Sequence, residues 1–262
     1  MSFEKKLIFL AAVMTWHTPA NAFVLLSKTP HRLAATPEAP TVTFAWDELA
    51  PGIGEKSELF DGAQSELSDA DYMALLLQLA MDQWNDVHGS FLKLELTRDP
   101  TITSSGTASG EDAVHTITLD PSVGATAAAY ATPNWQVGGN DSNVIGDCDV
   151  HISDRDTTAL SLIRTLVHEL GHCVGLGHNH SNYRAIMGYA RDGDSYKLGA
   201  DDKSGVIWLY PDPTVIDESP KDLIACGVIP GVGDFRTNPG LWAGVLLALP
   251  LLWAGISARG RT

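Results

Sequence analysis

"HELGHCVGLGHNH", residues 168–180, places four histidines and one glutamate within thirteen consecutive positions. His168 and His172 are four residues apart, so on a helix both imidazoles project from the same face and can bind one metal ion. Glu169 is turned about 100° around the helix axis from His168, which places it beside the ion rather than on it. This spacing favours zinc, with Glu169 as the general base for an activated water.

The glycine of this stretch predicts how a third ligand reaches the ion. Gly175 follows His172 by three residues, and glycine tolerates the left-handed conformation in which a helix ends and reverses. The reversal can bring His178 back to the metal. Three protein ligands leave the fourth position for water, as in catalytic rather than structural zinc sites. His180 lies outside this pattern, and we interpret it as a surface residue.

These motifs resemble a known family. The pattern HExxHxxGxxH, which runs from His168 to His178, is the zinc-binding pattern of metzincins. Met187, in "AIMGY", matches the methionine turn that packs beneath their metal. The residues of the zinc motif and of "LGADDKSGVIWLY" (198–210) are similar to those of the matrixin branch. The resemblance covers about residues 40–212.

The resemblance implies an α+β fold of the metzincin type, with a twisted mixed sheet, long helices and a small C-terminal subdomain after Gly175. The substrate would lie in the cleft between the two parts, along an edge strand for which "AAYAT" (128–132) is the candidate. The implied activity is zinc-dependent hydrolysis of peptide bonds within proteins or peptides. The alternative enzyme is a zinc amidase that acts on a non-protein amide such as peptidoglycan.

Two classes without catalysis are weighed against this interpretation. A zinc-binding surface module without activity would be expected to have lost Glu169, which is present. A structural surface protein stapled by zinc would need a fourth protein ligand, which the pattern does not supply.

The sequence departs from matrixins at several points. Asn179 stands where they usually have serine, and no cysteine precedes Cys148, so the propeptide thiol of their zymogens is missing. The loop expected over 133–147 has no histidine, so their second, structural zinc is not expected. Asp141 and Asp147 are candidate oxygen ligands for calcium, and solvated acids are the alternative.

Tyr189, two residues after Met187, matches astacins and serralysins better than matrixins. In families with this tyrosine, the phenol can approach the zinc and then donate a hydrogen bond to the oxyanion of the transition state. We therefore predict a catalytic role for Tyr189. The alternative is a tyrosine that only packs in the wall of the cleft.

Hydrophobic periodicity predicts the remaining elements. A helix opens at Ser68 with Asp71 as its capping-box partner, and a second runs from Asp156 or Thr157 into the zinc motif. A third, over 201–210, has two acids in its first turn, where the helix dipole favours them. Alternating residues predict strands over 41–48, 91–96, 114–119, 128–132 and 148–153.

Three cysteines are too few for a disulfide-built scaffold. Cys148 begins the strand just before the zinc helix, and Cys173 lies on that helix directly after His172. We predict a disulfide between them, which would brace the helix against the sheet. Two buried thiols are the alternative, and Cys226 is left over in either case.

Both ends of the chain predict processing or anchoring. Residues 1–22 combine Lys5 and Lys6, an apolar run and a small-residue cleavage site at Ala22, which indicates a signal peptide and export. A leader segment (23–37), the catalytic domain (38–212) and a Pro-rich linker (213–240) are expected to follow.

The last residues are predicted to contact a membrane. The uncharged run from Leu241 to Ile256 would span about 24 Å as a helix, against about 30 Å for a hydrocarbon core. With the basic tail (258–262) we interpret 241–257 as a membrane segment, either a permanent anchor or a bacterial sorting signal with Cys226 in its motif. A buried core helix is the alternative.

The charge of the chain is one-sided. Outside residues 1–22 and 241–262 it carries 13 basic and 31 acidic side chains, a net charge of −18. Nucleic acid is therefore not expected as a partner, because phosphate binding needs a positive surface.

Overall fold

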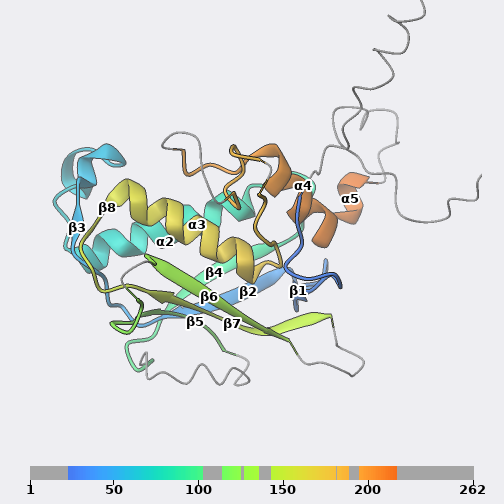
Figure 1. Cartoon of the computed structure of the whole chain (residues 1–262), viewed down its shortest axis with the longest axis horizontal. Helices are drawn as coiled ribbons and strands as arrows, with labels where there is room; N and C mark the ends of the chain where they lie inside the picture. Colours follow the sequence, from blue (N-terminus) through green and yellow to red (C-terminus); the bar gives the residue numbers. More distant parts are fainter. Residues whose placement is uncertain are drawn as a thin grey trace, which may run out of the picture. The chain divides into compact units, whose positions relative to one another are not determined.

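The computed structural model describes residues 23–102, 114–124, 127–135, 143–180, 182–188 and 195–216. One mixed sheet has six strands in the order β1-β7-β5-β2-β4, with β6 beside β7 (Figure 1). These strands are β1 (Arg32–Leu33), β2 (Thr41–Trp46), β4 (Lys93–Arg98), β5 (His115–Leu119), β6 (Ala129–Trp135) and β7 (Val144–Ile152). The predicted α+β class, with a mixed sheet, is confirmed.

β6 runs antiparallel to β7. Each pair of neighbouring strands along the path β1-β7-β5-β2-β4 is parallel. β6 pairs with β7 from Ala129 opposite Ile152 onward, and no described strand pairs with its other side. The segment 128–132 therefore lies at an edge of the sheet, as the sequence predicts.

The loop expected over 133–147 is shorter in the structure. Pairing between β6 and β7 continues through Pro133 opposite Cys148 and Asn134 opposite Asp147, with an irregularity at Trp135. Strand pairing extends beyond the residues 128–132 and 148–153 that were predicted as strands. Asp147 therefore lies within β7 and is buried, not in an exposed loop.

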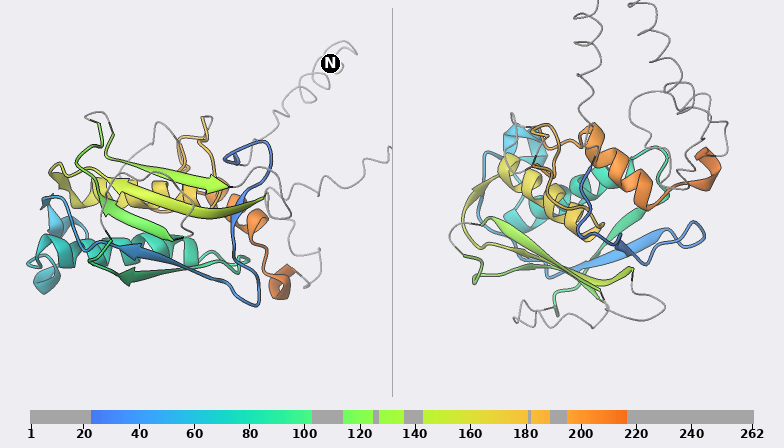
Figure 2. Two further views of the ribbon diagram at one scale, coloured as in Figure 1. Left: turned by 90° about the horizontal axis from the view of Figure 1, so that it is seen from below. Right: turned by 45° about the vertical axis from the view of Figure 1, so that its right-hand side comes forward.

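Two long helices, α2 (Asp69–Asn85) and α3 (Ala159–Cys173), cover one face of the sheet (Figures 1 and 2). α2 begins where predicted, since the Ser68 hydroxyl accepts a hydrogen bond from the Asp71 backbone N–H at 3.1 Å. α3 begins at Ala159, two or three residues later than predicted, because Thr157–Thr158 form β8, which pairs with β3 (Ile53–Gly54). Thr158 is the N-cap of α3.

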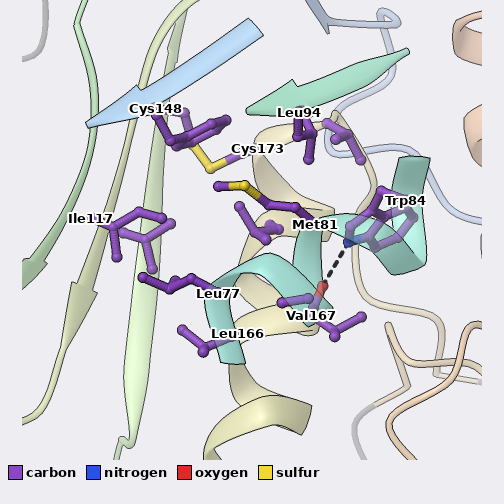
Figure 3. Close-up of a cluster of buried hydrophobic side chains, with 14 of the residues drawn as sticks. Leu77, Met81, Trp84, Leu94, Ile117, Cys148, Leu166, Val167 and Cys173 are labelled. Atoms are coloured by element: carbon purple, nitrogen blue, oxygen red, sulfur yellow. Dashed lines mark hydrogen bonds between the residues drawn. A yellow bond between two sulfur atoms is a disulfide. The ribbon is translucent and has the colours of Figure 1, made fainter. Parts of the chain in front are cut away.

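The core lies between these helices and the sheet (Figure 3). Side chains from α2, α3, β4 and β5 meet there, and the Trp84 indole N–H donates to the Val167 carbonyl oxygen at 3.2 Å. That bond holds α2 against the turn of α3 just before His168. Labelled members of this cluster are Leu77, Met81, Trp84, Leu94, Ile117, Leu166 and Val167.

A disulfide crosses this core. It joins Cys148 on β7 to Cys173 on α3, with both cysteines fully buried and their Cα atoms 5.6 Å apart. The C-terminal end of α3 is thereby fixed covalently to β7 (Figure 3).

We expect non-reducing peptide mapping to recover Cys148 and Cys173 in one linked pair of peptides. Replacing both by alanine should lower the free energy of unfolding by about 2–4 kcal/mol, because the bridge restrains the unfolded chain. Chemical denaturation measures this loss, and the Cys226→Ala protein is the control expected to be unchanged. Free thiols at both positions, or a bridge to Cys226, would contradict the pairing.

The chain after α3 forms a smaller part that ends in α4 (Ala200–Leu209) and α5 (Pro213–Ile216). Tyr210, directly after α4, is fully buried. Its hydroxyl donates to the Val174 carbonyl oxygen at 2.9 Å and accepts from the Leu33 N–H at 2.8 Å. One side chain therefore joins α4, the turn after α3 and β1. Two short 3-10 helices, η1 (Lys56–Glu58) and η2 (Gly62–Gln64), precede α2.

Residues 23–37, expected as a separate leader, are part of the fold. β1 pairs with β7, and Leu33 is only 1% exposed. Upstream, the Leu26 N–H donates to the Gly175 carbonyl oxygen at 2.9 Å, and the Gly177 N–H donates to the Val24 carbonyl oxygen at 2.8 Å. Residues 23–37 therefore pack on the domain expected over 38–212, because they satisfy backbone groups of the turn that follows α3.

Within the described ranges, no helix is long and apolar enough to cross a membrane. The expected signal peptide (1–22), most of the linker, the apolar segment (241–257) and the basic tail (258–262) lie outside these ranges.

Candidate metal centre

The imidazoles of His168, His172 and His178 converge beside the C-terminal half of α3. The Nε2 atom of His178 lies 3.1 Å from Nε2 of His168 and 3.1 Å from Nε2 of His172. Nitrogens bound tetrahedrally to one zinc at about 2.0–2.1 Å would be about 3.3 Å apart. The spacing therefore fits three ligands of a single ion. Among the described residues, no fourth His, Cys, Asp or Glu joins this group.

The other ring nitrogens fix the tautomers. Nδ1 of His168 lies 2.7 Å from the Ile186 carbonyl oxygen, and Nδ1 of His172 lies 2.8 Å from that of Leu176. Because a carbonyl oxygen only accepts, both Nδ1 atoms carry the proton, and both Nε2 lone pairs face His178. Such contacts typically orient histidine ligands of metals. The residues present therefore fit zinc.

Burial favours the uncharged form of His172. Desolvation, with the nearby His178 adding to it, lowers the pKa of His172 to about 4, although its bond to Leu176 acts in the opposite direction. The ring is therefore neutral at neutral pH, which is the form that binds metal.

Gly175 makes the reversal that the sequence predicts. Its φ is +104°, in the region that favours glycine, and its N–H donates to the His172 carbonyl oxygen at 3.0 Å. A Cβ atom here would collide with the carbonyl oxygen of His31. The chain can thus turn toward His178 only with a glycine at this position.

Met187 lies under the zinc helix, as expected for the methionine turn. It is 2% exposed, and a Cβ atom added to Gly171 would collide with its sulfur. Gly171 comes directly before His172, so the methionine packs against the helical turn that carries the ligands. Its place in the structure is consistent with packing rather than chemistry.

Asp202 is a residue whose role at this site the sequence did not reveal. It is 2% exposed, and its carboxylate accepts from the backbone N–H groups of Ile186 (2.7 Å), Met187 (3.2 Å) and Gly199 (2.8 Å). Burial raises its pKa against the effect of these bonds. The sequence signal was only an acid in the first turn of a helix, which indicates no particular partner.

The other predicted residues are distributed as follows. Glu169 lies on α3 and is 8% exposed, whereas His180 is exposed and its ring centroid is 6.5 Å from that of His178. Tyr189 and Asp141 lie outside the described residues. Asp147 is buried within β7, and calcium remains a prediction.

Comparison with known proteins agrees with this geometry. The sequence model of one family, the matrixins, matches residues 58–211. The chain belongs to the matrixin family. As a matrixin it is a zinc metallopeptidase, and its substrates are proteins or peptides.

Two solved structures are similar to this matrixin in part. Metalloproteinase-II from Bacteroides fragilis is 17% identical with a TM-score of 0.35, over 73% of this chain and 59% of that one. The GM1-bound form of the ECX AB5 holotoxin is 9% identical with a TM-score of 0.43, over 72% of this chain and 89% of that one.

Proposed function

We propose that this matrixin is an exported, membrane- or surface-tethered metalloendopeptidase that uses Glu169 as its general base. The observation that supports it most directly is the convergence of three Nε2 atoms, two of them with Nδ1 fixed by backbone carbonyls. With three protein ligands in the group, a position remains for water and substrate.

The proposed reaction uses Glu169, which lies on α3 next to His168 in the sequence. When bound, zinc supplies a Lewis acid that polarises the scissile carbonyl and acidifies water. Glu169 takes a proton from the attacking water as the new C–O bond forms. It then delivers that proton to the amide nitrogen as the C–N bond breaks, so the products are a carboxylate and an amine.

The substrate is proposed to lie along β6. This strand has an open side among the described residues, and it lies next to α3, which carries His168 and His172. An extended peptide can add to such an edge through main-chain hydrogen bonds, which place its backbone beside the metal. Recognition of backbone suits a protein substrate better than a glycan-linked amide.

The decisive experiment is to map cleavage sites with the purified, zinc-loaded 23–240 protein on a peptide library made from a whole proteome. We expect cuts inside chains, with new amino termini that are absent from the Glu169→Gln control. Release of amines from peptidoglycan, with no cut peptides, would instead support the amidase.

Tyr189→Phe should lower kcat at least about tenfold while KM stays nearly unchanged. The substitution removes one hydroxyl and keeps the ring, so the loss would report a hydrogen bond made only in the transition state. Steady-state kinetics on a fluorogenic peptide, identified by the cleavage mapping, measures both constants. An unchanged kcat would assign Tyr189 to packing in the wall of the cleft.

Deleting residues 241–262 should transfer the protein from the membrane fraction to the soluble fraction. The proposed anchor lies in this segment, which is uncharged for sixteen residues and ends in arginines. Immunoblots of fractionated cells compare it with the full-length chain. Equal membrane association of the two proteins would exclude both the permanent anchor and the sorting signal.

A further inference from the structure

We propose that Asp201 is a positioning residue of the zinc centre, which acts through Asn179 and Asn182 to hold His178 in place as the third ligand. This inference rests on the proposed binding of zinc by the three histidines. It assigns to Asp201 a task distinct from that of its neighbour Asp202, which holds the methionine turn.

The position of His178 is set by a loop, whereas the other two ligands are placed by a helix. His168 and His172 are on α3, which the disulfide and the core hold against the sheet. His178 follows the reversal at Gly175 and lies outside any helix or strand. The position of His178 therefore depends on the backbone on both sides of it: the Gly177 N–H before it is bonded to the Val24 carbonyl oxygen, and Asn179 follows it.

Asn179 is the residue that is fixed there. It is 3% exposed, its backbone N–H donates to the Met187 carbonyl oxygen at 2.8 Å, and it forms an isolated bridge with Gly188. Its side-chain Nδ2 donates to Oδ2 of Asp201 at 3.1 Å. The residue after the third ligand is thus held by the methionine turn on one side and by α4 on the other.

Asp201 receives a second amide at the same oxygen. Nδ2 of Asn182 also donates to Oδ2 of Asp201, so one carboxylate joins both ends of the stretch that follows His178. Bonds to an ionised acceptor are stronger than bonds between neutral groups.

The two bonds differ in their access to water: Asn179 is 3% exposed, whereas Asp201 and Asn182 are half-buried. A cavity of only about 10 Å³ adjoins Asp201 and Asn179, and it is bordered by Phe23, Val24 and Leu176. A cavity of this size has room for about one water molecule. Loss of the carboxylate charge would weaken the bonds from both asparagine amides, so the loop that carries His178 would be held less firmly.

The test is zinc affinity, measured in the full-length protein by competition with a chromophoric chelator. Asp201→Asn keeps an acceptor oxygen but loses the charge that strengthens both bonds, so it should raise the zinc Kd by about tenfold, the lower end of the usual effect of changing a group that orients a metal ligand. The visible spectrum of the cobalt-substituted protein should change as well, because it reports ligand geometry. The melting temperature of the zinc-free protein should change little.

Asn179→Ala is the second variant, and it keeps the test decisive if Asp201→Asn folds poorly. Its effect on the zinc Kd should be similar, and the double variant should lose less than the product of the two single losses, because both act through one contact. Asp71→Asn is the matched control: it makes the same change in the first turn of α2, and its zinc Kd should equal that of the unchanged protein.

An unchanged zinc Kd and cobalt spectrum in both Asp201→Asn and Asn179→Ala would overturn the positioning role and leave the proposed function intact. An equal loss of zinc affinity in Asp71→Asn would overturn it too, because the loss would then be a general effect of the lost charge. If the unchanged protein failed to bind zinc, the proposed function would fail together with this inference.

Discussion

Glu169→Ala should abolish peptidase activity while the protein still binds one zinc. We expect kcat/KM to fall by about 10²–10⁴-fold, the range that a general acid–base group contributes. The zinc should remain because Glu169 is not among the three converging groups, and it is turned about 100° around the helix from His168. Zinc content by mass spectrometry and hydrolysis of the fluorogenic peptide give the two readings.

Glu169→Gln is the matched control for shape. Glutamine keeps nearly the same volume at this buried position but cannot accept a proton at neutral pH, so both variants should be inactive. Full zinc content with activity retained in either variant would disprove the mechanism. Loss of zinc in Glu169→Gln would show instead that Glu169 belongs to the metal site itself.

His178→Ala should lose both zinc and activity. Apparent zinc binding in four-ligand sites is about 10–16 kcal/mol, so one ligand corresponds to roughly 3 kcal/mol, or more than a hundredfold in Kd. The two helical histidines remain aligned, since Ile186 and Leu176 fix their Nδ1 atoms. Dialysis against a weak chelator followed by metal analysis should find zinc in the unchanged protein and almost none in this variant.

His180→Ala provides a control with the same chemical change two residues later. His180 is exposed and outside the group of three Nε2 atoms, so its removal should leave zinc affinity unchanged. Equal zinc loss in the two variants would mean that the ligand set is wrong. Circular dichroism of both proteins checks that the helices are kept.

The sequence by itself determined the local features of the site. His168 and His172 share a face because the helix repeat is 3.6 residues, and Gly175 marks the reversal because its φ must be positive. The N-cap at Ser68 was also predictable from the sequence, because its hydrogen-bond partner Asp71 is only three residues away. Each of these features depends on neighbours within one or two turns of the chain.

Other features were decided only by the tertiary structure. The bonds of Asp202 to Ile186 and Met187, and of Asp201 to Asn179, join residues that an intervening loop brings together. The placement of residues 23–37 within the fold depends on backbone groups of the turn after α3 and of β7. Backbone N–H and C=O groups are the same in nearly every residue, so the sequence carries no mark of which distant ones will pair. That is why the pattern HExxHxxGxxH gave the three candidate ligands, while the bond of Asp201 to Asn179, next to the third of them, appeared only once the chain was folded.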